Sequence, residues 1–205
     1  MKPNARRYES DRNEERDAER DELFVQTLNH IRHDWLNDIQ VLYGYLKLKK
    51  YDKLHDYVDT IKEKMIRESA ISKLGVPSLI VYLQSFRVRS RSVRLDVELE
   101  PAFQLTSLPV DAEAVSDTII AVIETLLRHV AVPADGDVNR LRLAMSAEED
   151  RVVIGFDYAG GYDDAGLRRD LGETMRASVA GHRIANGATY NEGGAAFYIY
   201  VPLGG

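Results

Sequence analysis

Apolar residues recur at steps of three and four along the first third of the chain. The first set is Phe24, Leu28, Ile31, Trp35, Ile39, Leu42 and Leu46. Steps of this size predict an amphipathic helix over residues 21–49, with one narrow apolar stripe. The second set is Leu54, Val58, Ile61 and Met65. It predicts another helix over residues 52–72, and the short connection between the two predicts an antiparallel hairpin.

A hairpin with one apolar stripe on each helix cannot enclose a core by itself. We therefore expect two copies of the chain to pair, so that two hairpins form a four-helix bundle in a homodimer. The spacing of the stripe, close to 3.5 residues per turn, favours this kind of packing. The sequence leaves open the alternative that the hairpin packs on its own C-terminal region.

The pattern changes after Gly75 and Pro77, where strands begin to alternate with helices. Helices are predicted over residues 78–89, 111–130 and 177–185, and strands over residues 93–100, 140–146, 152–158, 188–190 and 196–201. One sheet covered by helices on one face is an α+β arrangement. We therefore expect a charged tail over residues 1–20, a helical hairpin over residues 21–75 and an α/β sandwich over residues 76–205.

The composition narrows the classes of partner. Residues 1–22 are almost all polar or charged, so they form no secretory signal; they are either a disordered tail or an extension of the first helix. The formal net charge of −6 argues against nucleic acid. No apolar run approaches the roughly 18 residues of a membrane span. The absence of cysteine excludes disulfides and thiolate metal sites. We expect a soluble, cytoplasmic protein.

One histidine lies on the side of the first helix opposite to the apolar stripe. At about 100° per residue, His33 falls about 180° from Phe24. The positions around it are polar yet almost uncharged, whereas a solvated helix face usually carries lysine and glutamate. They are Gln26, Asn29, His30, Asn37, Gln40 and Gly44.

An exposed histidine in this setting can act as a nucleophile. An exposed imidazole ordinarily has a pKa of about 6.5, so such a side chain offers a neutral ring nitrogen at neutral pH. Attack on phosphorus needs an open in-line approach, which a convex helix face provides. Asp34 is placed to support the imidazolium form, and Asn37 to donate a hydrogen bond to a phosphoryl oxygen. The alternative is a surface histidine without a role.

A protein that brings a reacting group to His33 must lie along the same helix surface. The expected contact residues are Asn29, His30, Leu36, Gln40, Tyr43 and Gly44. Leu36 and Tyr43 lie at the edge of this surface as apolar anchors. Gly44 lets a docked backbone come close, because it has no side chain.

The run from Asn29 to Val41 contains the pattern R-H-D-x-x-N-x-x-Q, with His33, Asp34, Asn37 and Gln40 at its fixed positions. This stretch resembles the phosphotransferases of the sporulation phosphorelay, which are related to sensor histidine kinases with the same phospho-acceptor box. The resemblance implies that His33 is phosphorylated. It also implies two response regulators as partners, a single-domain donor and a transcription-factor acceptor. The regulators would supply Mg²⁺, so we expect this chain to bind no cofactor or metal.

The same resemblance implies that the second domain is a degenerate ATP-binding domain of the GHKL type found in histidine kinases. Thr125 and His129 stand where the family has asparagines that hold magnesium and phosphates. The adenine turn corresponds to residues 157–161, where Asp157 remains but the middle glycine is Ala159. The lid corresponds to residues 175–184 and offers only Gly181. The sequence therefore predicts a retained fold without ATP chemistry.

Two other functions share parts of this pattern. One is an ATP-dependent sensor-type histidine kinase, which has the same histidine box but needs intact nucleotide motifs. The other is a non-enzymatic scaffold that only binds response regulators, and it predicts no phosphohistidine. A phosphotransferase without ATP hydrolysis or autokinase activity is the interpretation that the residues favour.

Overall fold

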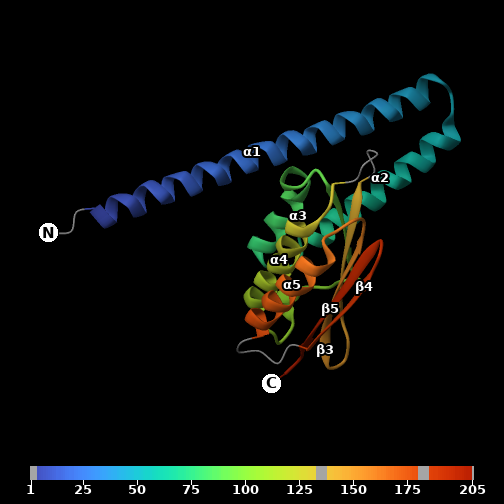
Figure 1. The fold of residues 1–205 in the computed structure, drawn as a ribbon. Coiled ribbons are helices and arrows are strands. Elements are labelled where there is room, and N and C mark those ends of the chain that lie inside the picture. Colours follow the sequence, from blue (N-terminus) through green and yellow to red (C-terminus); the bar gives the residue numbers. More distant parts are fainter. Residues whose placement is uncertain (1–3, 133–137, 180–184, 205) are drawn as a thin grey trace. The chain divides into compact units, whose positions relative to one another are not determined.

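The computed structural model describes residues 4–132, 138–179 and 185–204 (Figure 1). The helices are α1 (Asn4–Lys47), α2 (Tyr51–Ile71), α3 (Pro77–Arg89), α4 (Ala112–His129) and α5 (Asp164–Val179), with a 3-10 turn at Leu105–Ser107. The strands are β1 (Val93–Leu99), β2 (Asn139–Ala147), β3 (Arg151–Ala159), β4 (Ala185–Asn191) and β5 (Gly194–Pro202). The chain forms two compact units, Met1–Lys62 and Glu63–Gly205.

The first unit is a helical hairpin, as the stripes predict. The charged N-terminal segment continues the first helix, since α1 begins at Asn4. The turn places Lys49 in the left-handed region, at φ 53°. Beyond the turn, the Tyr57 hydroxyl donates to Asp38 Oδ1 at 2.8 Å and the Tyr57 ring meets Tyr45 edge to face. That hydrogen bond is the main cause that raises the pKa of Tyr57.

The apolar stripe of α1 is not buried by the hairpin. Six of its seven residues are at least 45% exposed. They are Phe24, Leu28, Ile31, Trp35, Ile39 and Leu46. Leu42 is half-buried. A continuous row of exposed aromatic and aliphatic side chains is costly in water, so this face is suited to cover by another surface.

The second unit is a two-layer α+β domain. Its sheet has the order β1-β2-β3-β5-β4, with β1 and β2 parallel and the other pairs antiparallel. Helices α3, α4 and α5 lie together on one face of this sheet (Figure 1). Alternate residues of β3 face the helices and are buried: Val152, Ile154, Phe156 and Tyr158. The expected fold class, a helical hairpin followed by an α/β sandwich, is confirmed.

The division between the units falls inside α2, before the predicted boundary at residues 75 and 76. The end of α2 belongs to the second unit because Ile71 and the following Leu74 are buried in its core. Leu105 N–H also donates to the Leu74 carbonyl at 3.1 Å. The second unit therefore includes the last turns of the helix that leads into it.

The last helix differs from the prediction of residues 177–185. Helix α5 spans Asp164–Val179, and Ala185 already belongs to β4. Residues 180–184 lie outside the described part of the chain. The apolar face of α5 is narrow, with Leu167, Leu171 and Met175 at steps of four, all buried. Its two glycines and charged residues hid this pattern, so the helix was predicted too late in the sequence.

Candidate active site

His33 lies on the exposed surface of α1, as predicted. Its Nδ1 atom is 3.1 Å from Nδ2 of Asn37, one helical turn further on. This contact follows from the i, i+4 geometry of a helix, which places the two side chains one above the other. Among the described residues, no hydrogen bond to Nε2 of His33 is found. The ring is therefore held at Nδ1, and its Nε2 has no hydrogen-bond partner among the described residues.

Asp34 and His30 form a second pair beside this histidine. The Oδ1 atom of Asp34 is 3.9 Å from Nε2 of His30, and the two side chains are 23% and 40% exposed. Nε2 of His30 is itself buried and has no hydrogen-bond partner within the described structure. The helical wheel placed His30 on the open surface with His33. In the structure the side chain is 40% exposed, with its Nε2 end turned out of solvent.

The other predicted contact residues line the exposed surface of α1. The side chains of Asn29, Leu36, Gln40 and Tyr43 are exposed. Asn29 accepts a hydrogen bond from Arg32 at 2.8 Å, and Lys47 Nζ lies 4.7 Å from the centre of the Tyr43 ring. At Gly44 a β-carbon would meet no atom within 4 Å. The helix therefore presents an open surface on which a partner can lie.

The residues that the structure describes contain no group of three or more histidine, aspartate or glutamate side chains that could hold a metal. No helix among them is long and apolar enough to span a membrane.

In the second unit, Thr125 is used for packing between α4 and α5. Its side chain is buried, and its hydroxyl is 2.9 Å from that of Thr174 and donates to the Ala121 carbonyl at 2.7 Å. Arg128 donates to the same hydroxyl at 3.1 Å. These contacts surround the hydroxyl with partners from the protein itself.

His129 continues this polar contact one turn further along α4. Its Nε2 is 2.9 Å from Asp170 of α5, and its Nδ1 is 3.7 Å from Asp163. His129, followed by Arg169, holds the pKa of the Asp170 carboxyl below its ordinary value. We call these pairs, Thr125–Thr174 and His129–Asp170, the α4–α5 seam. Thr125 and His129, which the family resemblance matches to asparagines, are thus both engaged in contacts within the protein.

Asp157, the remaining acid of the predicted adenine turn, does not face the helices. It lies on the opposite face of β3, where it accepts from Arg142 at 2.9 Å and from the Tyr198 hydroxyl at 3.4 Å. Tyr158 faces the core instead, and its hydroxyl donates to the Gly161 carbonyl at 2.8 Å. Burial raises the pKa of Tyr158 to about 12. The alternation of apolar residues along β3 already places Asp157 on the outer face.

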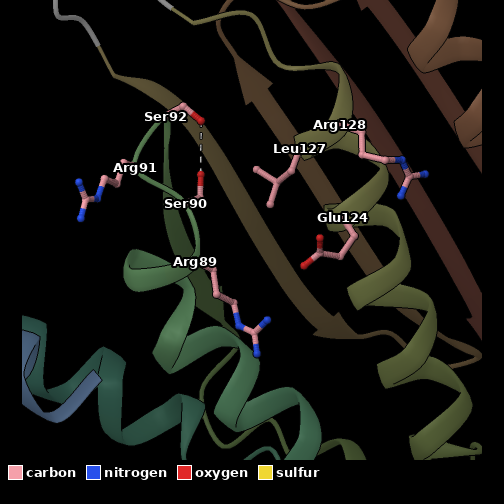
Figure 2. Close-up of a pocket in the computed structure, with 7 residues that line it drawn as sticks. All are labelled: Arg89, Ser90, Arg91, Ser92, Glu124, Leu127 and Arg128. Carbon is pink, nitrogen blue, oxygen red and sulfur yellow. Dashed lines mark hydrogen bonds between the residues drawn. The ribbon is translucent and has the colours of Figure 1, made fainter. Parts of the chain in front are cut away.

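A cavity of about 420 Å³ lies between the end of α3, the loop after it and α4 (Figure 2). Arg89 and Glu124 extend toward it, whereas Arg91 and Arg128 extend away on opposite sides (Figure 2). Arg89 donates to Ser85 at 3.0 Å, and Glu124 accepts from the Tyr82 hydroxyl at 2.8 Å. The sequence did not predict this cavity, and the two charged groups that extend toward it are already held by neighbours.

Comparisons with known proteins agree with the sequence motif. Residues 14–74 match the family model of the alpha-helical domain of the SpoOB-type sensor kinases. The chain is also 22% identical over 169 residues to sporulation initiation phosphotransferase B of Bacillus subtilis (strain 168), covering 77% of this chain and 84% of that protein. The resemblance to this family is confirmed.

Solved structures of histidine kinases are also similar to this chain. The Acinetobacter baumannii histidine kinase AdeS is 13% identical, with a TM-score of 0.45, and the match covers 84% of this chain and 98% of that one. The histidine kinase ThkA in complex with the response regulator protein TrrA is 16% identical, with a TM-score of 0.46. That match covers 97% of this chain and 66% of the ThkA chain.

Proposed function

We propose that this protein is a phosphotransferase in which His33 carries a phosphoryl group from one response regulator to another. The observation that carries the proposal is the position of His33 on an open helix surface, where Asn37 holds Nδ1 and no described residue makes a hydrogen bond to Nε2. The similarity to sporulation initiation phosphotransferase B supports a role in two-component phosphotransfer. The response regulator bound to ThkA is a partner of the kind proposed.

The reaction consists of two displacements at phosphorus. In the first, the lone pair of His33 attacks the aspartyl phosphate of the donor regulator. A nitrogen–phosphorus bond forms and the bond to the aspartyl oxygen breaks, which regenerates the donor's carboxylate. In the second, the acceptor's aspartate attacks and the nitrogen–phosphorus bond breaks. Each regulator supplies its own acidic pocket and Mg²⁺. In this proposal the donor is a single-domain regulator and the acceptor a transcription factor.

The active form is proposed to be a homodimer. The exposed stripe of α1 gives each hairpin an apolar face suited to a four-helix bundle. His33 lies about 180° from that stripe on the helix, so pairing leaves it accessible. The second unit is proposed to take no part in ATP chemistry. The α4–α5 seam and the outward position of Asp157 support this.

A label-transfer assay tests the proposal. A candidate regulator carrying radioactive phosphate is mixed with the wild-type protein, His33→Gln or His30→Gln. The wild type and His30→Gln should acquire an acid-labile, base-stable label, and His33→Gln should acquire none. Thermal stability of His33→Gln should be nearly unchanged, because the side chain is exposed. Labelling of His33→Gln but not of His30→Gln would mean that His30, and not His33, is the phosphorylated residue. No label on the wild type would favour the scaffold.

A further inference from the structure

The contact between His33 and Asn37 bears on which ring nitrogen reacts. A neutral imidazole carries one N–H group and one lone pair, and the hydrogen bond made at one nitrogen fixes the state of the other. We propose that Asn37 is a positioning residue that accepts the Nδ1 proton of His33 through its amide oxygen, so that Nε2 keeps the lone pair that attacks phosphorus. This inference rests on the proposed function, because it assigns a step in that transfer.

The orientation of the Asn37 amide decides which nitrogen of His33 keeps the lone pair. The oxygen and nitrogen of an amide are nearly the same in shape, so their assignment follows from the hydrogen bonds they make. With Nδ2 next to His33, Nδ1 would accept and Nε2 would carry the proton; the covered nitrogen would hold the only lone pair. With Oδ1 there, Nδ1 donates and the open nitrogen, Nε2, becomes the nucleophile. Within the described structure, no other hydrogen bond of Asn37 opposes this orientation.

An amide acceptor also suits a nucleophilic ring, because the imidazole must be neutral to attack phosphorus. A carboxylate beside Nδ1 would favour the protonated imidazolium and raise the pKa of His33. A neutral amide orients the ring without adding a negative charge beside it. The side chain 3.1 Å from Nδ1 is Asn37. The nearby carboxylate of Asp34 has its Oδ1 3.9 Å from the other histidine, His30.

The proton balance of the transfer is then simple. As Nε2 bonds to phosphorus, the bond from phosphorus to the donor's aspartyl oxygen breaks. The Nδ1 proton stays on His33 and its hydrogen bond to Asn37 remains, so the ring becomes a phosphorylated imidazolium. When the acceptor's carboxylate takes the phosphoryl group, the electron pair returns to Nε2. No general base is needed in either step.

Nitrogen NMR of the full-length protein labelled with ¹⁵N-histidine tests this role without any transfer reaction. The His33 signals are identified by their loss in His33→Gln. Above the pKa of the ring, the wild type should show a protonated Nδ1 and an unprotonated Nε2. Asn37→Ala should shift the equilibrium toward the Nε2–H form. Asn37→Asp should keep Nδ1 protonated and raise the pKa of His33. Gln26→Ala, an amide whose hydrogen bond is to Glu22, should change neither property.

The transfer assay gives a second measurement. Asn37→Ala should slow phosphoryl acceptance about tenfold at neutral pH, which corresponds to about 1.4 kcal/mol. Asn37→Asp should accept phosphate at a near wild-type rate when the pH is above the raised pKa of His33. Below that pKa the rate should fall. An unchanged tautomer in Asn37→Ala would overturn this inference even if His33 is phosphorylated. A tautomer controlled by Asn37 in a protein that never accepts phosphate would instead sink the proposed function and leave the tautomer assignment standing.

Discussion

At the scale of single residues, the surface around His33 combines a reactive group with space for a partner. A response regulator presents its aspartate in a pocket ringed by loops. It must lie along α1 to bring that aspartate in line with Nε2. Residues one to three turns from His33 then touch it. The open space above Gly44 and the exposure of Gln40 fit this requirement.

Gly44→Arg and Gln40→Glu should therefore slow phosphoryl transfer through weaker docking. The loss should affect the donor and the acceptor regulator alike, because one histidine serves both. Gly44→Arg should not unfold the protein, since a side chain at this position meets no atom of the chain within 4 Å of its β-carbon. Transfer rates with each regulator and thermal melting measure the two effects.

Gly44→Ala is the matched control for that variant. It changes the helix propensity in the same direction but adds only a methyl group, so its effect on transfer should be much smaller. If Gly44→Arg and Gln40→Glu both left the transfer rates intact, while substitutions in the second unit abolished them, regulators would dock elsewhere.

At the scale of the elements, the stripe of α1 should hold the proposed dimer together. Ile39→Asp places a charge on a face that pairing would bury, so it should convert the dimer to a monomer. Leu42→Ala should cost about 2–5 kcal/mol of dimer stability if the bundle buries this side chain fully. Light scattering and denaturant titration measure these changes. Gln26→Asp, a charge added off the stripe, should stay dimeric. A loss under about 0.5 kcal/mol for Leu42→Ala, well below that range, would show that the stripe is misassigned.

The α4–α5 seam should make the stability of the second unit depend on pH. Since His129 and Arg169 lower the pKa of Asp170, the folded state binds its proton less readily than the unfolded chain. The stabilising effect is therefore present above the unfolded pKa of about 4 and is lost as the pH falls through the folded value. Asp170→Asn should lower the melting temperature at pH 7.

The difference between Asp170→Asn and the wild type should shrink as the pH is lowered below about 4. Asp150→Asn is the control: it removes a carboxyl group that is 82% exposed and should have little effect at any pH. A melting difference for Asp170→Asn that stays constant down to strong acid would mean that its charge does not act through the seam.

How far the sequence determines these elements depends on the clarity of each pattern. The hairpin and the strands β2, β3 and β5 were predicted because their periodicities are long and regular. Helix α5 was misplaced because only Leu167, Leu171 and Met175 mark its buried face. The position of His33 follows from helix geometry alone. The inward turn of His30 and the partners of Asp157 depend on side-chain contacts that no spacing specifies.

At the scale of the whole molecule, the second unit has side chains that hold one another at the two positions where the family resemblance predicts lost nucleotide contacts. The purified protein should therefore show no measurable ATP binding by calorimetry and no self-labelling from ATP with Mg²⁺. Replacing Thr125 and His129 together by asparagine should not restore either property, because Asp157 remains on the outer face of the sheet with Arg142 and Tyr198.

The double variant should instead melt at a lower temperature than the wild type, because it removes both α4 partners of the seam. His55→Asn is a control on the hairpin, at an exposed position, and should keep the wild-type melting temperature. This pair of measurements separates the two interpretations of the second unit. Loss of stability without ATP affinity means that these positions now serve packing alone. Micromolar ATP affinity in the wild type, or its appearance in the double variant, would favour the ATP-dependent kinase, with the nucleotide site still formed by the fold.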